Sequence, residues 1–466
     1  MRAQRLQRHT YGLAKQNPAL QSGTLPPCIL RYAAGEVSYG STLLTTSQGR
    51  AVLADKSEAG ASQSPASNEA MAHRFHPWGK PPWKVNFRPA SRDLPEQADF
   101  AIVGGGFTGL AAAAWLRKLA PQKSVLVLEA ATLGEGASGR TGGLVLAETA
   151  AGALPGLGDV LAGYKRILRA LHIDSGLEFP GVWELGRSRG QKNSPISWSD
   201  SGNLRVVRQV AGGVIDPGKV VSGLGRASEK AGAWIIENAR VQKIVYSKPL
   251  RLRVRQSLRG RVLRKEIRAG QVLLATNAFS LNLSRLRGHA APRLTFALAS
   301  APLSRRQIRA IGLSSRRPFY TVDFPYLWGR LLGANRIIFG AGLVPMPSTF
   351  AALFRDPPPR GRGATALSPL YRFAVRKGES AERLRWLEDR VRLLHPALKS
   401  VRITHRWGGP ILFTEGMLPI FRAHPRSKNI LIAGGYNGHG VALSVYFGKW
   451  AAEALLGHRF LPRWEH

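Results

Sequence analysis

The sequence predicts an α/β fold, α+β over the whole chain, on three observations. A short apolar strand, a glycine-rich turn, a helix and a second strand follow one another within residues 99–129. A strand, a glycine turn and an apolar-spaced helix occur at 431–456, and residues 251–268 alternate as the two strands of a hairpin do. At 466 residues, the chain is long enough for two or three ordinary domains or for one large two-lobed protein.

The first segment has the order of residues that a dinucleotide-binding turn requires. Phe100–Val103 is a continuous apolar strand, and Gly104 makes a tight turn that only a residue without Cβ tolerates. Gly106 lets a diphosphate approach the backbone, and Gly109 lets the helix Leu110–Leu119 pack closely on the sheet. A diphosphate would then face the unpaired N–H groups and the positive end of that helix.

The second strand of the unit, Ser124–Leu128, ends in Glu129. A carboxylate at this position can accept hydrogen bonds from both ribose hydroxyls of an unphosphorylated adenosine, which argues against NADP. The glycine motif alone leaves NAD and FAD open. Residues 138–143, Ser-Gly-Arg-Thr-Gly-Gly, form a further flexible loop with one cation that suits the far side of a diphosphate. A plain NAD domain has no need of that loop, so it favours FAD.

With these motifs the chain resembles the D-amino-acid oxidase superfamily of flavoenzymes, in its glycine oxidase, sarcosine oxidase and gamma-glutamylputrescine oxidase-like branch. The resemblance runs from about Trp83 to Gly457. It implies a discontinuous Rossmann-like FAD-binding domain with an inserted, mainly antiparallel β substrate domain. Five further motifs stand in family order: Ile215–Gly218 before a helix, Ala275–Ala278, Arg406–Gly409, Leu418–Pro419 and Gly434–Gly440.

The domain boundaries follow from the same resemblance. Residues 1–82 are rich in Ser, Ala, Gln and Gly with little periodic hydrophobicity, so we expect a poorly ordered extension. Met71 opens the family-like part and is an alternative start of the chain. We assign 98–150, 203–293 and 400–457 to the FAD-binding domain and 151–202 and 294–399 to the substrate domain.

The motifs and the resemblance together assign residues to the cofactor. Cys28 is the one cysteine, and it lies outside the family-like region. Thr141 stands in the loop where other amine dehydrogenases carry a tethering histidine, so we expect FAD without a covalent bond. No metal site is expected. The predicted FAD-binding residues are Gly104, Gly106, Phe107, Thr108, Gly109, Glu129, Ala130, Ser138, Arg140, Thr141, Gly142, Gly143, Val241, Ala275, Thr276, Pro419, Gly435, Asn437, Gly438, His439 and Gly440.

The resemblance implies oxidation of the CH–NH bond of an amine or amino acid by hydride transfer to flavin N5. The imine would hydrolyse, and dioxygen or another acceptor would reoxidise the flavin. N–H groups of the turn 434–440 can face flavin N1 and the C2 carbonyl and stabilise negative charge there. Two roles stay open for His439. It lies near the flavin ring or the diphosphate, or it only orders the turn in which it stands. Pro419 lies under the flavin or makes a rigid turn.

Aromatic residues and one arginine are the candidates for the substrate side. The resemblance aligns Arg330 with an arginine on a substrate-domain strand that faces the flavin, where a guanidinium could grip a carboxylate. A surface arginine is the alternative. Tyr326, Trp407, Tyr320 and Trp328 could wall an apolar amine pocket, or could be ordinary core residues. Arg330, His439, Tyr326 and Trp407 are therefore the predicted catalytic-site residues.

The net charge of +39 raises the question of an anionic partner. The first 70 residues hold only seven of the 67 basic residues, so the charge belongs to the rest of the chain. Its densest run, 251–268, predicts a hairpin with one arginine-rich face, which charge would protect from self-association. Nucleic acid stays open as a partner, and with it a modified tRNA wobble base as substrate. A non-catalytic nucleotide-binding protein is the third hypothesis.

The sequence also bears on location. The longest apolar run, Ala101–Leu116, is interrupted by the glycines of the turn and is too short for a membrane span. The first thirty residues contain arginines but neither a continuous apolar segment nor a twin-arginine pair. We therefore expect no membrane span and a cytoplasmic location, and the oligomeric state stays open.

Overall fold

A computed structural model describes residues 78–187, 190–258, 261–279, 281–286, 289–323, 325–344, 378–462 and 464. These residues belong to one compact unit, Glu69–His466. The expected extension, 1–82, and the alternative start at Met71 therefore lie outside the described residues, apart from 78–82.

The first sheet is the expected nucleotide-binding sheet. Its central strands run parallel, and β1 pairs with β2 from Phe100–Val125 to Val103–Leu128. All four residues of β2 are buried, as is usual for a parallel strand covered on both faces. The strand order is β17 (Ile420–His424), β18 (Ser427–Gly434), β11 (Arg261–Leu274), β1 (Gln97–Val103), β2 (Val125–Leu128) and β8 (Trp234–Ile236), with β10 (Leu250–Leu258) beside β11 and β9 (Ala239–Val245) beside β10.

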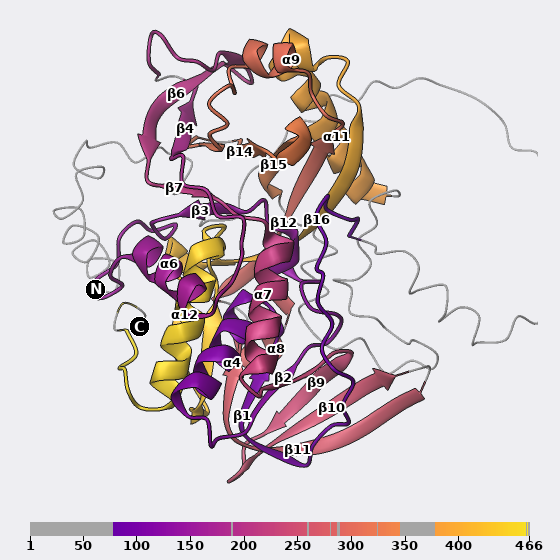
Figure 1. Ribbon diagram of the computed structural model, residues 1–466, viewed down its shortest axis with the longest axis vertical. Coiled ribbons are helices and arrows are strands. Elements are labelled where there is room, and N and C mark those ends of the chain that lie inside the picture. Colours follow the sequence, from indigo (N-terminus) through magenta and orange to yellow (C-terminus); the bar gives the residue numbers. More distant parts are fainter. Residues whose placement is uncertain are drawn as a thin grey trace, which may run out of the picture. The chain divides into compact units, whose positions relative to one another are not determined.

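Helices pack on this sheet and on one another. In Figure 1, α12 runs beside α4 and α6. A Cβ on Gly448 of α12 would lie 2.6 Å from the Thr108 carbonyl oxygen, so α12 and α4 touch through their backbones. Asp216 caps α7 by accepting the Lys219 N–H at 3.0 Å. The helices are α4 (Phe107–Leu119), α5 (Ala137–Arg140), α6 (Val160–Ala170), α7 (Pro217–Lys230), α8 (Leu281–Ser284) and α12 (Gly440–Leu455).

The second sheet is mainly antiparallel, as expected for the inserted domain, and only its β13–β4 pairing is parallel. Trp198, Phe319 and Phe339 form the centre of its core with ring centroids 4.9–6.0 Å apart. The strand order is β16 (Ile403–Thr414), β12 (Ala290–Ser300), β15 (Ile337–Val344), β14 (Leu327–Leu331), β13 (Phe319–Thr321), β4 (Val182–Gly186), β6 (Asn203–Val210) and β5 (Trp198–Ser199). The fold class predicted from the sequence is confirmed.

Short elements complete the unit. A small sheet pairs β3 (Leu144–Leu146) with β7 (Gly212–Val214). The helices α9 (Arg305–Ala310) and α11 (Gly378–Leu394) belong to the part of the chain that builds the second sheet. The 3₁₀ turns are η1 (Asn277–Phe279), η2 (Gly333–Asn335), η4 (Pro396–Leu398) and η5 (Glu415–Met417).

Three predicted domain boundaries need correction. The segment 203–293 was expected in the FAD-binding domain, but β6 pairs with β4 and β5 of the second sheet. The segment 400–457 begins with β16, which pairs with β12 over almost its whole length. The segment 151–202 was expected in the substrate domain, yet α6 packs on α12 in the hydrophobic core of the first sheet. An alternating or apolar pattern predicts an element but does not name the sheet it joins.

The arginine-rich hairpin has the expected form. The strands β10 and β11 pair antiparallel from Leu250–Ala269 to Leu258–Arg261. Arg251, Arg253 and Arg268 are exposed, and Glu266 forms ion pairs with the first two. Within the described ranges, no helix is both long and apolar enough to cross a membrane.

Candidate functional site

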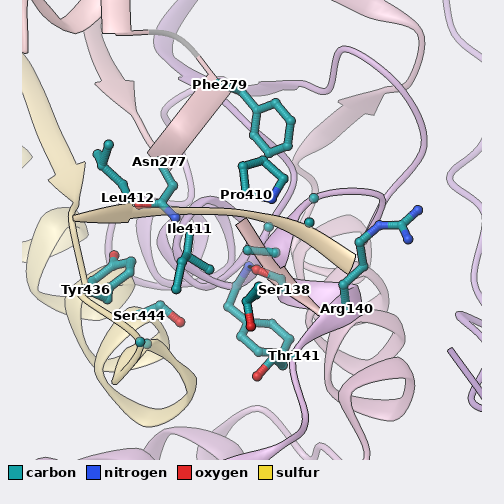
Figure 2. Close-up of a pocket in the computed structure, with 18 of the residues that line it drawn as sticks. Ser138, Arg140, Thr141, Asn277, Phe279, Pro410, Ile411, Leu412, Tyr436 and Ser444 are labelled. Carbon is teal, nitrogen blue, oxygen red and sulfur yellow. Dashed lines mark hydrogen bonds between the residues drawn. The ribbon is translucent and has the colours of Figure 1, made fainter. Parts of the chain in front are cut away.

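A cavity of about 980 Å³ lies where the two sheets meet. This volume is at the upper end of the range for small-molecule sites. One part of the lining comes from the ends of β1, β2 and β11 and from β9, and the other part comes from β12, β13, β14 and β16. Figure 2 shows β16 crossing this cavity with Pro410, Ile411 and Leu412 on it.

The glycine turn has no side chains at the positions that face the ligand, because backbone segments approach one another too closely there for a Cβ. Gly104 has φ +112°, and a Cβ on it would lie 2.7 Å from the Ala275 carbonyl oxygen. A Cβ on Gly109 would overlap the Gly104 carbonyl, and one on Gly106 would lie 2.8 Å from Ser138 Oγ. The N-terminus of α4 therefore opens on the cavity without a Cβ at positions 104, 106 and 109, which fits a dinucleotide diphosphate.

Ser138 completes this cradle. Its Oγ accepts a hydrogen bond from the Phe107 N–H at 2.9 Å and satisfies the first amide of α4. A hydroxyl that accepts one bond can still donate its own proton, and an anionic oxygen in the cavity is a suitable acceptor. Ser138 is thus placed for the role expected of it.

Glu129 follows β2 and faces the cavity. Its Oε2 accepts the Gly105 N–H at 2.7 Å, and its Oε1 accepts the Ala131 N–H at 2.9 Å. Burial raises the pKa of the Glu129 carboxyl, and these two N–H groups oppose the shift. Each oxygen retains a lone pair, so the fixed carboxylate can accept further hydrogen bonds from a diol.

The C-terminal turn is fastened by two asparagines. Asn437 has φ +51°, and its Oδ1 accepts the Thr414 N–H at 2.8 Å while its Nδ2 donates to the Gly435 carbonyl at 2.7 Å. Asn277 accepts the Gly435 N–H at 3.0 Å. The hydroxyls of Thr108 and Tyr436 lie 2.6 Å apart and join α4 to the same turn. The start of α12 is therefore held toward the cavity.

His439 lines the cavity at the start of α12. Burial lowers the pKa of its imidazole, and the Asn437 carbonyl, 3.4 Å from Nδ1, opposes the shift. The lowered pKa favours the neutral ring, which offers a dipole rather than a charge to a ligand.

An aromatic wall closes the other part of the cavity. Tyr320, Tyr326, Trp328 and Trp407 all line it. Trp328 fits between two glycines, because a Cβ on either Gly142 or Gly340 would overlap its ring. The wall is therefore in direct contact with the loop that follows α5.

Two tryptophans hold the end of α5, directly before that loop, through hydrogen bonds. Trp407 Nε1 donates to the Arg140 carbonyl at 2.9 Å, and Trp83 Nε1 donates to the Gly139 carbonyl at 2.7 Å. The two rings meet edge to face with centroids 5.5 Å apart. Sequence reasoning did not assign Trp83 to the site. Trp83 lies before the first strand, and no local sequence pattern there indicated a contact with α5.

Most predicted site residues line the cavity. The structure adds residues 408–413 of β16 and Phe296 of β12. The Arg406–Gly409 motif contained Gly408 and Gly409 of this strand, but the sequence analysis gave them no role in the site. The predicted residues in the lining are Gly104, Gly106, Phe107, Thr108, Glu129, Ala130, Ser138, Arg140, Thr141, Gly142, Val241, Ala275, Thr276, Tyr326, Trp407, Asn437, Gly438, His439 and Gly440.

Arg330 does not line the cavity, and its assignment as a carboxylate clamp needs correction. Its Nε donates to the Gly142 carbonyl at 2.6 Å, and its Nη2 donates to the Ile215 carbonyl at 2.7 Å. The residue is 6% exposed, and burial lowers the pKa of the guanidinium to about 10. Arg330 therefore joins β14 of the second sheet to the backbone just before β3 and just after β7 of the small sheet.

The guanidinium of Arg140 is also committed to the protein. It forms an ion pair with Glu135 and donates to the Gly79 carbonyl at 2.8 Å. In Figure 2 it points away from Ser138 and Thr141. The expected role of this cation at the far side of a diphosphate is thus not supported by its contacts.

Four other predicted residues lie outside the lining and support it from behind. A Cβ on Gly143, at φ +76°, would overlap the Ile215 carbonyl, and one on Gly435 would lie 2.6 Å from Thr414 Cγ2. Gly109 is required by the close turn described above. Pro419 is buried directly before β17 and is not part of the cavity lining. Of the described residues, no three His, Cys, Asp or Glu side chains are grouped to hold a metal ion.

We expect Arg330→Lys to lower the free energy of unfolding by about 2–4 kcal/mol, because lysine cannot reach both carbonyls and its charge stays buried. At saturating cofactor, the KM of any substrate should change less than about threefold, since Arg330 does not touch the cavity. Chemical denaturation and steady-state kinetics measure the two quantities. A tenfold rise in KM with an unchanged free energy of unfolding would instead support Arg330 as a clamp for a substrate carboxylate.

Comparison with protein families gives a match over residues 99–454 to the DAO model, described as FAD dependent oxidoreductase. The probable oxidoreductase OrdL of Rhizobium meliloti is 27% identical over 414 residues, 79% of this chain and 86% of its own length. The gamma-glutamylputrescine oxidoreductase of Escherichia coli is 26% identical over 404 residues, 77% of this chain and 84% of its own length.

Solved structures share the fold. Glycine oxidase from Geobacillus kaustophilus is similar with a TM-score of 0.56 and 19% identity, covering 78% of this chain and 96% of that one. L-amino acid deaminase from Proteus myxofaciens has a TM-score of 0.58 and 15% identity, covering 81% and 94%. The family match spans the glycine turn, the aromatic wall and the C-terminal turn, and the chain therefore belongs to the DAO family of FAD-dependent oxidoreductases.

Proposed function

We propose that the protein oxidises the CH–NH bond of an amine at the boundary between the aromatic wall and the C-terminal turn. The observation that carries this proposal is that both features line one cavity with the glycine cradle. A bound FAD would supply a hydride acceptor at N5 and a route for the two electrons to dioxygen, with hydrogen peroxide as product, or to another acceptor.

The chain's own residues have distinct tasks in this proposal. The cradle at Gly106 and Ser138 binds the diphosphate, and Glu129 binds the adenosine ribose. The amides at the start of α12 and the helix dipole stabilise negative charge near the C-terminal turn. The aromatic wall positions the neutral amine and excludes water, so no proton-abstracting side chain is required.

The position of Arg330 informs the choice of substrate. The relatives are named for γ-glutamylputrescine and for glycine, so an amine and an amino acid are both precedents. Because the Arg330 guanidinium is committed to two backbone carbonyls, we rank amines without a carboxylate on the reacting carbon ahead of α-amino acids. Imine formation and hydrolysis would release a carbonyl product.

The arginine hairpin does not favour a nucleic-acid substrate. It lies beside β9, whose residues 239–242 line the cavity next to Glu129, and the Ala239 N–H donates to the Glu129 carbonyl at 2.7 Å. The aromatic wall comes from β13, β14 and β16, and Figure 1 shows β14 well away from β10. A nucleic acid bound to the hairpin would therefore lie at the adenosine part of the cavity.

We also propose that FAD is held without a covalent bond. The cavity residues that the structure describes include no cysteine, and Thr141 occupies the loop after Glu129. Acid precipitation should release all of the flavin into the supernatant, and flavin that stays with the precipitated protein would contradict this.

An anaerobic absorbance titration tests the function. We expect the bound flavin to be bleached by at least one compound among glycine, sarcosine, D-alanine, proline, putrescine and γ-glutamylputrescine, and fastest by a diamine derivative. Bleaching only by α-amino acids would keep the reaction and reverse the substrate ranking. A yellow protein that none of them bleaches would contradict amine oxidation.

The role of Glu129 gives a separate prediction. Glu129→Gln should weaken FAD binding by about tenfold to a hundredfold, because charged acceptors make the stronger hydrogen bonds to hydroxyls. Burial raises the pKa of Glu129, so protonation should weaken wild-type affinity at a higher pH than for an ordinary glutamate. The variant should lose that pH dependence. Fluorescence titration of the apoprotein measures both effects.

Glu237→Gln is the matched control, because Glu237 is partly buried nearby, accepts the Leu133 N–H at 2.7 Å and does not line the cavity. Equal losses of FAD affinity in the two variants would contradict a specific ribose contact at Glu129.

A further inference from the structure

The connection between β13 and β14 forms part of the aromatic wall. Val322 and Tyr326 of this connection line the cavity, and Tyr326 is 37% exposed at its edge. The Leu327 N–H donates to Thr321 Oγ1 at 2.9 Å, which closes the base of the connection. The Val322 N–H donates to the Leu185 carbonyl at 2.9 Å. A half-exposed segment of this kind needs further contacts to hold one conformation.

Two arginines from distant parts of the chain supply those contacts. Arg187 follows β4, and Arg390 lies on α11. Their Nη2 atoms both donate to the Pro325 carbonyl at 2.8 Å. Arg390 Nη1 donates to the Tyr326 carbonyl at 3.1 Å, and Arg187 Nη1 donates to Asp323 Oδ1 at 2.5 Å. The backbone on both sides of the Tyr326 nitrogen is thus fixed by guanidinium groups.

Asp200 joins the two arginines. Its Oδ2 lies 2.6 Å from the Nη2 of Arg187 and 2.6 Å from the Nη2 of Arg390, and its Oδ1 accepts Arg390 Nε at 2.9 Å. Asp200 and Arg390 are each 8% exposed. With Asp323, the network holds two cations and two anions, so every buried charge has a partner of opposite sign.

We propose that Asp200 and Arg390 are positioning residues that set the aromatic wall, through Tyr326, for substrate binding. This inference rests on the proposed function, in which the wall binds the amine. None of the four network residues Arg187, Asp200, Asp323 and Arg390 lines the cavity. The two arginines act instead through the Pro325 and Tyr326 carbonyls. Planar guanidinium groups on fixed carbonyls specify one position of the segment more narrowly than apolar packing does.

The test compares Arg390→Lys and Asp200→Asn with Arg392→Lys. Arg392 lies on the same helix and donates to Glu388 and to the Lys399 carbonyl, outside the network. Rapid-mixing measurements of flavin reduction give the dissociation constant of the amine and the limiting rate. We expect the dissociation constant to rise about tenfold or more in the two network variants, with a limiting rate within about threefold and the control within about twofold of wild type.

Tyr326→Ala shows whether the network acts through the wall. If it does, Arg390→Lys should add less than about twofold to the dissociation constant in the Tyr326→Ala background. Effects that multiply fully in the double variant would overturn the inference.

Hydrogen–deuterium exchange of the FAD-loaded protein separates this inference from the proposed function. Arg390→Lys should raise exchange in peptides covering 321–328 and leave 431–440 unchanged. Unchanged exchange at 321–328 would overturn the positioning role even if amines are oxidised. Failure of every amine to reduce the wild-type flavin would defeat the proposed function, and the exchange result would still decide whether the network holds the segment. If Asp200→Asn does not fold, Arg390→Lys alone is used for the dissociation constant and for the hydrogen–deuterium exchange.

Discussion

The close approach of backbone to backbone around the glycine turn is the constraint on which the site depends. The turn at Gly104 meets the end of β11 at Ala275, and α12 meets α4 where Gly448 faces Thr108. No side chain fits at these points, so the two helices begin beside the same cavity. The dipoles and N-terminal amides of the two helices then act on one ligand from two directions. This geometry is suited to a diphosphate at the start of α4 and to a flavin ring that takes up negative charge at the start of α12.

The second sheet is coupled to this centre by polar groups as well as by packing. Arg330 donates to the Gly142 and Ile215 carbonyls beside the small β3–β7 sheet, and the Trp328 ring fits between Gly142 and Gly340. Trp407 and Trp83 hold the loop after Glu135 by their indole N–H groups. The aromatic wall is therefore in direct contact with the segment that follows the Ser138 cradle, and displacement of one would displace the other.

The sequence predicted the local elements well because their signals are local. The helix expected at Leu110–Leu119 is observed as Phe107–Leu119, β1 and β2 are observed where strands were expected, and most residues predicted on the cofactor side line the cavity. Arg330 was misassigned because its partner carbonyl at Gly142 is 188 residues away, and no local pattern tells a carboxylate clamp from a contact with backbone. The sheet membership of β6 and β16 was wrong for the same reason, since strand pairing is long-range.

The central claim is that one cavity holds an entire FAD, with the adenosine at Glu129 and the ring near the C-terminal turn. Titration of the apoprotein with FAD and with FMN tests it most directly, because FMN lacks the adenosine and the second phosphate. We expect FAD to bind at least about a hundredfold more tightly, equivalent to roughly 3 kcal/mol from the cradle and Glu129. Equal affinity for FMN and FAD, or no binding of FAD, would contradict the account.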